Sequence, residues 1–153
     1  MKRQTSWISA LALLVACSSI TFSSDRLDAI QQELTRRYQE WKALRIAAYD
    51  YRFVRFCLCD SSLTRPVRVG VVDSAVSRVT YGDGSTAPDS LLRSFFTVEG
   101  LFRQIQTAIN LRVDSLVVEY DLLLHYPTKI VVDQDRLVPN DELALFASDL
   151  VRR

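Results

Sequence analysis

The sequence is poor in the residues and motifs that most enzymes and nucleic-acid-binding proteins use. Its 153 residues include a single His, 4 Gly and 4 Pro, and no P-loop, Gly-x-Gly-x-x-Gly or Gly-x-Ser-x-Gly sequence. A catalytic triad is not supported, because His125 has no neighbouring Ser or Cys in the sequence. The 19 Lys and Arg are balanced by 18 Asp and Glu, so a nucleic-acid backbone has little electrostatic reason to bind. We expect no catalytic residues, no cofactor and no nucleic-acid partner.

The first 17 residues are organised like a bacterial lipoprotein leader. Two basic residues precede an apolar stretch over residues 7–15, which is shorter than the roughly 20 residues of a transmembrane helix. Residues 14–17, Leu-Val-Ala-Cys, resemble a lipobox, where the chain is cut before a Cys that then carries lipid. We predict a signal peptide over residues 1–16 and lipidation of Cys17. The alternative is an ordinary secreted protein that is cut nearby, with Cys17 incidental.

The predicted lipid would hold the protein at a membrane of the bacterial cell envelope. Cys17 is followed by Ser18 rather than by the Asp that resembles an inner-membrane retention signal. In a cell with two membranes this favours the outer membrane, with the protein facing the periplasm. Residues 17–24 are then a polar tether, and residues 25–153 form a single domain of ordinary size.

Apolar residues at helical spacing predict two helices. The first covers residues 27–44 after a cap at Ser24 or Asp25, and the second begins after Thr97, a good N-cap. Runs rich in β-branched and aromatic residues predict the strands. These runs cover residues 49–58, 67–71, 76–81, 115–120, 128–133 and 142–150, and residues 82–90 are predicted as a loop.

The order of these elements is one helix followed by three strands, twice. It predicts an α+β fold, with an antiparallel sheet and two helices on one of its faces. A Pro followed later by Val-Val-Asp occupies like places in the two halves, beginning at Pro66 and at Pro127. The two helix-plus-meander halves are therefore candidates for an internal duplication.

Residues 40–150 resemble a family of bacterial lipoproteins that carry a domain of unknown function. The resemblance rests on Trp41, Tyr49-Asp50-Tyr51, Cys57-Leu58-Cys59, Pro66-Val67-Arg68-Val69, Gly82, Thr97-Val98-Glu99-Gly100-Leu101-Phe102, Tyr120-Asp121, Tyr126-Pro127 and Asp141-Glu142. The chain departs from the family at Ser74, where members usually have Gly after Asp, and at His125, where they usually have Gly before Tyr-Pro. The resemblance implies an exported, anchored domain and supplies no activity.

Cys57 and Cys59 are the most unusual local feature. Residues i and i+2 of a strand point to the same face about 6.6 Å apart. This is near the upper limit of about 6.8 Å between the Cα atoms of a disulfide, and a bulge or strand end at Asp60 would bring them closer. In an oxidising envelope we predict a structural disulfide. A redox-active disulfide, and a metal site or free thiols, remain alternatives, although two Cys and one His make zinc an unfavourable choice.

The remaining polar candidates favour ordinary surface roles. Asp133, Asp135, Asp141 and Glu142 lack the spacing and the Gly of a calcium loop, so we interpret them as solvated acids and predict no metal. An acid–base pair of Asp121 with Asp133 has no partner nucleophile. His125 is predicted to lie on the surface, in a turn.

Aromatic residues between positions 38 and 56 are predicted to lie in the core. The strand over residues 49–58 is apolar on both faces, so it is either covered on both sides or presents one face to a partner. The loop over residues 82–96 is a second candidate contact surface. We therefore favour a non-catalytic, lipid-anchored domain that binds an envelope protein, over a thiol–disulfide protein using Cys57 and Cys59 or a binder of a small envelope ligand.

Overall fold

A computed structural model describes residues 19–153, so the predicted signal peptide and Cys17 lie outside the described residues. The helices are α1 (Ser19–Ala43), α2 (Ser61–Thr64), α3 (Asp89–Leu92) and α4 (Val98–Leu111). The strands are β1 (Ala48–Phe56), β2 (Val67–Val72), β3 (Ala75–Tyr81), β4 (Ser115–Tyr120), β5 (Pro127–Asp133) and β6 (Leu143–Arg152).

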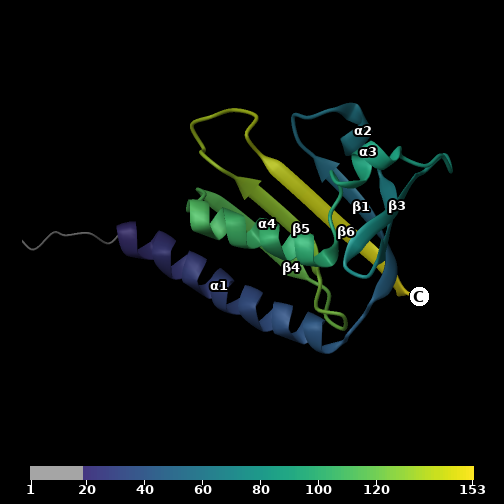
Figure 1. The fold of residues 1–153 in the computed structure, drawn as a ribbon. Coiled ribbons are helices and arrows are strands. Elements are labelled where there is room, and N and C mark those ends of the chain that lie inside the picture. Colours follow the sequence, from purple (N-terminus) through teal and green to yellow (C-terminus); the bar gives the residue numbers. More distant parts are fainter. Residues whose placement is uncertain (1–18) are drawn as a thin grey trace, which may run out of the picture.

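The six strands form one antiparallel sheet in the order β3-β2-β1-β6-β5-β4 (Figure 1). The predicted α+β class with an antiparallel sheet is confirmed, and residues 19–153 contain four helices rather than the two predicted. Each half of the chain contributes three neighbouring strands, and the halves join where β1 pairs with β6. The internal duplication stays a prediction.

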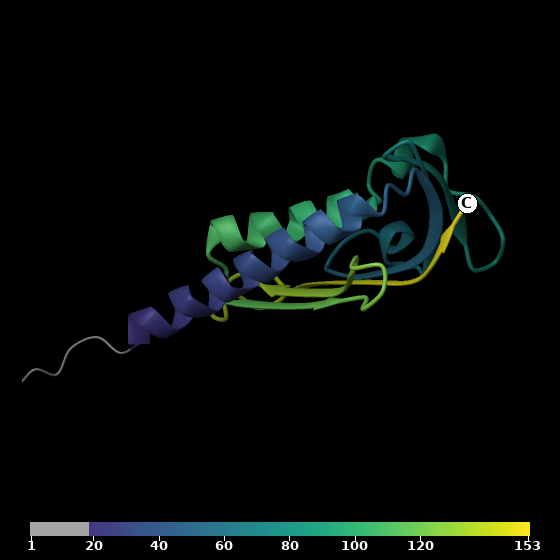
Figure 2. The ribbon, with the colours of Figure 1, turned by 90° about the horizontal axis from the view of Figure 1, so that it is seen from below.

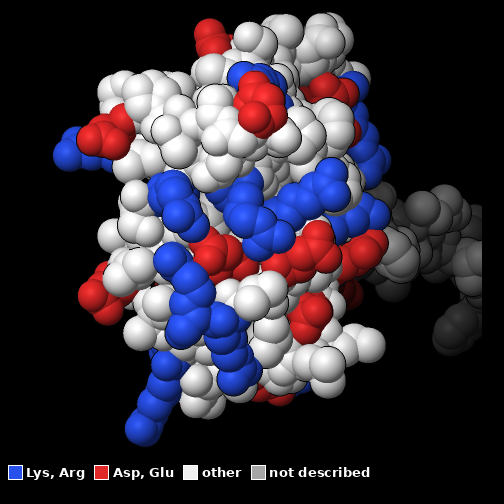
Figure 3. Space-filling view, turned by 90° about the vertical axis from the view of Figure 1, so that its right-hand side faces the viewer, with Lys and Arg blue, Asp and Glu red and all other residues white. Residues whose placement is uncertain are grey.

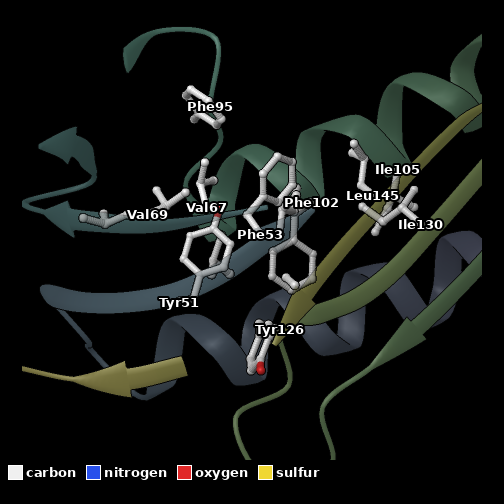
Figure 4. Packing of buried hydrophobic residues seen from close by; sticks show 14 of the residues in the cluster. Tyr51, Phe53, Val67, Val69, Phe95, Phe102, Ile105, Tyr126, Ile130 and Leu145 are labelled. Carbon is white, nitrogen blue, oxygen red and sulfur yellow. The ribbon is translucent and has the colours of Figure 1, made fainter. Parts of the chain in front are cut away.

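The core lies between one face of the sheet and the two long helices. Tyr49, Tyr51 and Phe53 of β1 are buried at alternate positions, as are Val67 and Val69 of β2. Figure 4 shows Tyr51, Phe53, Val67 and Val69 among the packed core residues. Figure 2 shows α1 and α4 on the same side of the sheet, where α4 packs on β4 and β5. Alternation along the strands therefore separates a face covered by helices, called here the covered face, from the opposite one, called here the open face.

The second long helix begins as its sequence predicts. The Thr97 side chain accepts a hydrogen bond from the backbone N–H of Gly100 at 3.1 Å, which satisfies one of the unpaired donors of the first turn. Glu99, in the same turn, accepts a hydrogen bond from the Trp41 indole at 2.8 Å. This contact ties α4 to α1.

The first helix is longer than predicted, because it begins at Ser19 and not near Asp25. The predicted caps, Ser24 and Asp25, therefore lie inside the helix. The sequence from Ser19 to Ala43 contains no Gly or Pro, so no helix-breaking residue stops the helix from extending toward the N-terminus. Within residues 19–153, no helix is both long enough and apolar enough to cross a membrane.

The other differences from the predicted elements lie at strand ends and in connections. β1 ends at Phe56, two residues earlier than predicted, and the short helices α2 and α3 occupy connections where no helix was predicted. Asp73 and Ser74 form the tight β2–β3 turn with φ of 48° and 63°. Positive φ at both central residues matches the hairpin turn that favours Asn-Gly or Asp-Gly, so the turn forms although Gly is absent.

Candidate binding face

The open face of the sheet carries an aromatic pair, of which one ring is exposed and the other half-buried. Phe56 of β1 is 59% exposed, and its ring packs edge-on against Phe146 of β6 at 5.8 Å between centroids. Val54 lies opposite Phe146 in the β1–β6 pairing, on the same face. We call Val54, Phe56 and Phe146 the aromatic strip. The prediction that Phe56 belongs to the core is therefore wrong, although it is right for Trp41, Tyr49, Tyr51 and Phe53.

Cys57 and Cys59 lie at the end of this strip and form a disulfide, with their Cα atoms 5.3 Å apart. The pair comes within bonding distance because β1 ends at Phe56, so the chain bends immediately afterward. Leu58, between the two Cys, is 85% exposed. A hollow of about 310 Å³ beside the disulfide is lined by Phe56, Leu58, Asn140, Glu142 and Ala144.

A second hollow, of about 500 Å³, lies on the open face over β1, β2 and β3. Its lining includes Arg52, Arg68, Arg78 and Thr80, and we call it the arginine hollow. Arg52 is directly opposite Arg68 in the β1–β2 pairing, and Arg68 is opposite Thr80 in the β2–β3 pairing. The side chains of directly opposite residues point to the same face, so these groups share one surface. Each of these arginines occupies an outward position of a predicted strand, but the sequence alone does not identify them as one site.

Among residues 19–153, carboxylates pair with arginines at the edge of the arginine hollow but not with Arg52 and Arg68 at its centre. Asp50, 14% exposed by side chain, lies 3.0 Å from the Arg153 guanidinium and 3.6 Å from that of Arg78. Within the described part of the chain, neither Arg52 nor Arg68 forms a salt bridge. Figure 3 views the end of the molecule that lies on the right in Figure 1, and it shows a band of basic side chains beside acidic ones.

The rim of the hollow holds a separate ion pair. Arg65 lies 2.7 Å from the carboxylate of Asp83, and its guanidinium lies over the Tyr81 ring. Hydrogen bonds from Ser85, followed by the bond from Arg65, lower the pKa of Asp83 to about 2. Asp83 therefore stays charged at neutral pH and faces Arg65, not the arginines opposite each other on β1 and β2.

A further arginine, Arg55, lies on the covered face and has a structural environment. Its guanidinium donates to the backbone carbonyl of Ser94 and lies 5.1 Å from the ring centre of Phe96 and 5.5 Å from that of Phe53. Burial lowers the pKa of Arg55. Because it is already held by aromatic rings and a carbonyl, we assign it to packing and exclude it from the candidate binding face.

His125 is half-buried in a network with α1 rather than free on the surface. Arg37 lies 3.0 Å from the Nδ1 atom of His125, and a carboxylate oxygen of Glu40 lies 3.2 Å from the same atom. Since a guanidinium only donates, the bond from Arg37 requires Nδ1 to accept. The imidazole is therefore held in place by α1, and no nucleophile is part of this network.

The acids of the β5–β6 connection do not assemble a metal site. Desolvation and the neighbouring charges of Asp141 and Glu142 raise the pKa of Asp133. The Asp141 carboxylate instead accepts a hydrogen bond from the backbone of Asp135 at 2.8 Å. Among the residues that the structure describes, no three His, Cys, Asp or Glu side chains are grouped to hold a metal ion.

The fold and this face define a small α+β protein whose sheet is covered by helices on one side and carries aromatic and arginine side chains on the other. The chain belongs to a family of unknown function (DUF6174), whose model matches residues 33–152. The match includes all six strands and therefore both the aromatic strip and the arginine hollow. No curated protein and no solved structure matches the chain. The family of unknown function is thus confirmed, whereas its lipoprotein character stays a prediction.

Proposed function

We propose that this protein is a lipid-anchored, non-catalytic domain of the bacterial cell envelope that binds an envelope protein through the open face of its sheet. Cys17 would carry the lipid, and in a cell with two membranes the domain would face the periplasm from the outer membrane. The leader sequence over residues 1–17 supports the anchor. The binding role depends on the open face.

The observation that carries the binding role is the exposed aromatic strip. Phe56 is 59% exposed and Leu58, two positions further along the chain, is 85% exposed, while helices shield the opposite face of β1. Aromatic side chains contribute most to protein interfaces when a partner desolvates them. An exposed aromatic cluster rimmed by polar residues is typical of an interaction site.

The position of α1 also supports this role. The helix begins two residues after Cys17, at the end of the molecule opposite β3 (Figures 1 and 2). Arg26 donates to the Leu116 carbonyl of β4 at 3.2 Å, whereas Trp41 near the other end of the helix packs edge-on against Tyr49 of β1. The helix therefore runs from β4 toward β1, and a lipid at Cys17 would hold β1, β2 and β3 away from the membrane.

The environment of the disulfide favours a structural role over thiol–disulfide exchange. A reactive thiol is activated by a neighbouring cation or a helix N-terminus. The hollow beside Cys57 is lined by Glu142 and Asn140 together with apolar groups, and no cation is among these lining residues. The helix α2 begins two residues after Cys59, but its N-terminus is already capped, because the Asp60 carboxylate accepts a hydrogen bond from the Ser62 N–H at 2.8 Å. A carboxylate next to a thiol disfavours the thiolate.

Two experiments in cells test the proposal. Metabolic labelling with an alkyne-bearing fatty acid is expected to mark the wild-type protein and not Cys17→Ser; equal labelling of both would contradict the anchor. A photo-reactive phenylalanine analogue at Phe56 is expected to give a protein adduct. The matched control is the same analogue at Leu137, which is 90% exposed in the β5–β6 connection. Adducts of equal yield at both positions, or none at Phe56, would contradict binding through the open face.

A further inference from the structure

We propose that the arginine hollow binds the carboxylates of an acidic, extended segment of the partner protein, while an apolar side chain of the same segment packs on the aromatic strip. This inference rests on the proposed function, which requires only that a protein binds the open face. The further step is the chemical character of the bound segment, which is acidic with one apolar side chain.

The arrangement of Arg52 and Arg68 carries the argument. The two residues are directly opposite each other on neighbouring strands, and both are exposed. Like charges at such positions destabilise a sheet. Among the described residues no carboxylate forms a salt bridge with either arginine. The facing pair of arginines is therefore unfavourable in the isolated domain. It becomes favourable when the domain binds an anion from outside.

The hollow offers suitable donors and space. Arg52, Arg68 and Arg78 line one hollow of about 500 Å³, and each guanidinium has five N–H donors in a planar fork. This fork binds a carboxylate through two parallel hydrogen bonds. Thr80, opposite Arg68, lies at the same surface.

Asp50 lies beside the hollow but does not fill it. Asp50 is drawn toward Arg153 and Arg78, and its Oδ1 atom is buried without a hydrogen-bond partner. Gly70 lies opposite Asp50, and a Cβ at Gly70 would be 2.8 Å from this Oδ1. The missing side chain at Gly70 thus lets Asp50 lie low over β2, at the edge of the hollow, and leaves Arg52 and Arg68 open to a partner.

The spacing of the outward side chains along β1 predicts how far apart the acidic and apolar residues of the bound segment lie. Arg52, Val54 and Phe56 project from the open face at successive outward positions. Four residues of strand span about 13 Å, so an extended chain running along β1 would place an acid and an apolar residue about four positions apart. Because the hollow lies toward β3, away from the start of α1, a tethered partner protein fits it better than the anchoring membrane (Figure 1).

The test is photo-crosslinking in cells from Thr80, which lines the hollow without supplying its charge. The analogue is placed at Thr80 in the wild type, in Arg52→Glu and in Arg103→Glu, whose arginine is exposed on α4. We expect an adduct whose crosslinked peptide is rich in Asp and Glu. Its yield is expected to fall at least tenfold in Arg52→Glu and to stay unchanged in Arg103→Glu.

A stability measurement separates binding from folding. In Arg52→Glu the new carboxylate faces Arg68, so the melting temperature is expected to stay equal or rise while the adduct is lost. A lower melting temperature together with a lost adduct would assign Arg52 to the fold and overturn the inference. Replacing the crosslinked acidic residues of the partner by Lys is expected to restore the adduct with Arg52→Glu.

The remaining outcomes distinguish this inference from the proposed function. A protein adduct at Phe56 combined with a Thr80 adduct on a segment without acids overturns the inference and leaves the proposed function standing. A lipid adduct at Thr80 assigns the hollow to a membrane surface and overturns the inference as well. No protein adduct at either position contradicts both.

Discussion

Phe53 and Phe56 are three residues apart on the same strand, yet Phe53 is 1% exposed and Phe56 is 59% exposed. Phe53 lies on the covered face, where its ring packs edge-on against Phe95 and Phe96. Phe56 lies on the open face, where its aromatic neighbour is Phe146. One strand therefore carries the same side chain in two settings, one inside the core and one on the surface.

The difference between the two faces indicates a division of roles. On the covered face, aromatic rings are part of one continuous hydrophobic core. The Trp41–Glu99 hydrogen bond and the capped start of α4 lie on the same side of the sheet. On the open face, Arg52 and Arg68 oppose each other and Phe56 stays in water, so this face contributes little to folding. We infer that the covered face determines the stability of the domain and that the open face is free to vary for binding.

The largest expected effect is at Phe53. Phe53→Ala removes a fully buried ring and leaves a cavity, so the free energy of unfolding is expected to fall by about 3–5 kcal/mol. Phe56→Ala on the same strand is expected to change it by less than about 1 kcal/mol, because the ring is mostly in water in both states. Urea denaturation of both variants measures the difference. A loss of more than about 2 kcal/mol at Phe56 would break the division between the two faces.

This comparison also shows what the sequence could predict. Runs rich in β-branched and aromatic residues predicted β1, β2 and β3, because such patterns are local. Thr97 was predicted as a cap because the capping bond spans only three residues. The exposure of Phe56 was not predictable, because both faces of β1 are apolar in sequence and only the packing of α1 and α4 decides which one is covered.

The candidate binding face was harder to predict for the same physical reason. Arg52 and Arg68 are separated by sixteen positions, and only the register of β1 with β2 makes them opposite each other. The sequence did predict the Cys57–Cys59 disulfide, since two residues on one short segment are always near each other. It did not show that the disulfide lies at the end of the aromatic strip, because Phe146 comes from the far end of the chain.

A smaller effect is expected when the disulfide is removed. The ring closed by Cys57 and Cys59 spans three residues, and for so short a loop the chain-entropy estimate is about 1.5 kcal/mol. Replacing both Cys by Ser is therefore expected to lower the free energy of unfolding by at most about 1.5 kcal/mol. Thermal unfolding of the wild type with and without reductant provides the matched comparison. A loss above about 3 kcal/mol would show that this end of the open face supports the core.

Removing the N-cap of α4, on the covered face, is expected to change the free energy of unfolding by about 1 kcal/mol. Thr97→Ala removes the acceptor of the Gly100 N–H and is expected to lower the free energy of unfolding by this amount. Thr107→Ala, at an exposed position in the middle of the same helix, is expected to have little effect or to stabilise slightly, since Ala is the better helix former. Equal losses in both variants would mean that the cap is not what stabilises the start of α4.

The smallest expected effect is a gain at the β2–β3 turn, next to the arginine hollow. Ser74 has a φ of 63°, which an L-residue with a Cβ adopts at a cost and Gly adopts freely. Ser74→Gly is therefore expected to raise the free energy of unfolding by about 0.5–1 kcal/mol. Ser74→Ala keeps the Cβ and is expected to give no gain, so the two variants separate backbone strain from loss of the hydroxyl.

Because the turn carries none of the hollow's arginines, crosslinking from Thr80 is expected to be the same in both variants. Weaker crosslinking in Ser74→Gly would show that binding at the open face needs a mobile β2–β3 hairpin. The covered face would then not determine stability independently of binding at the open face.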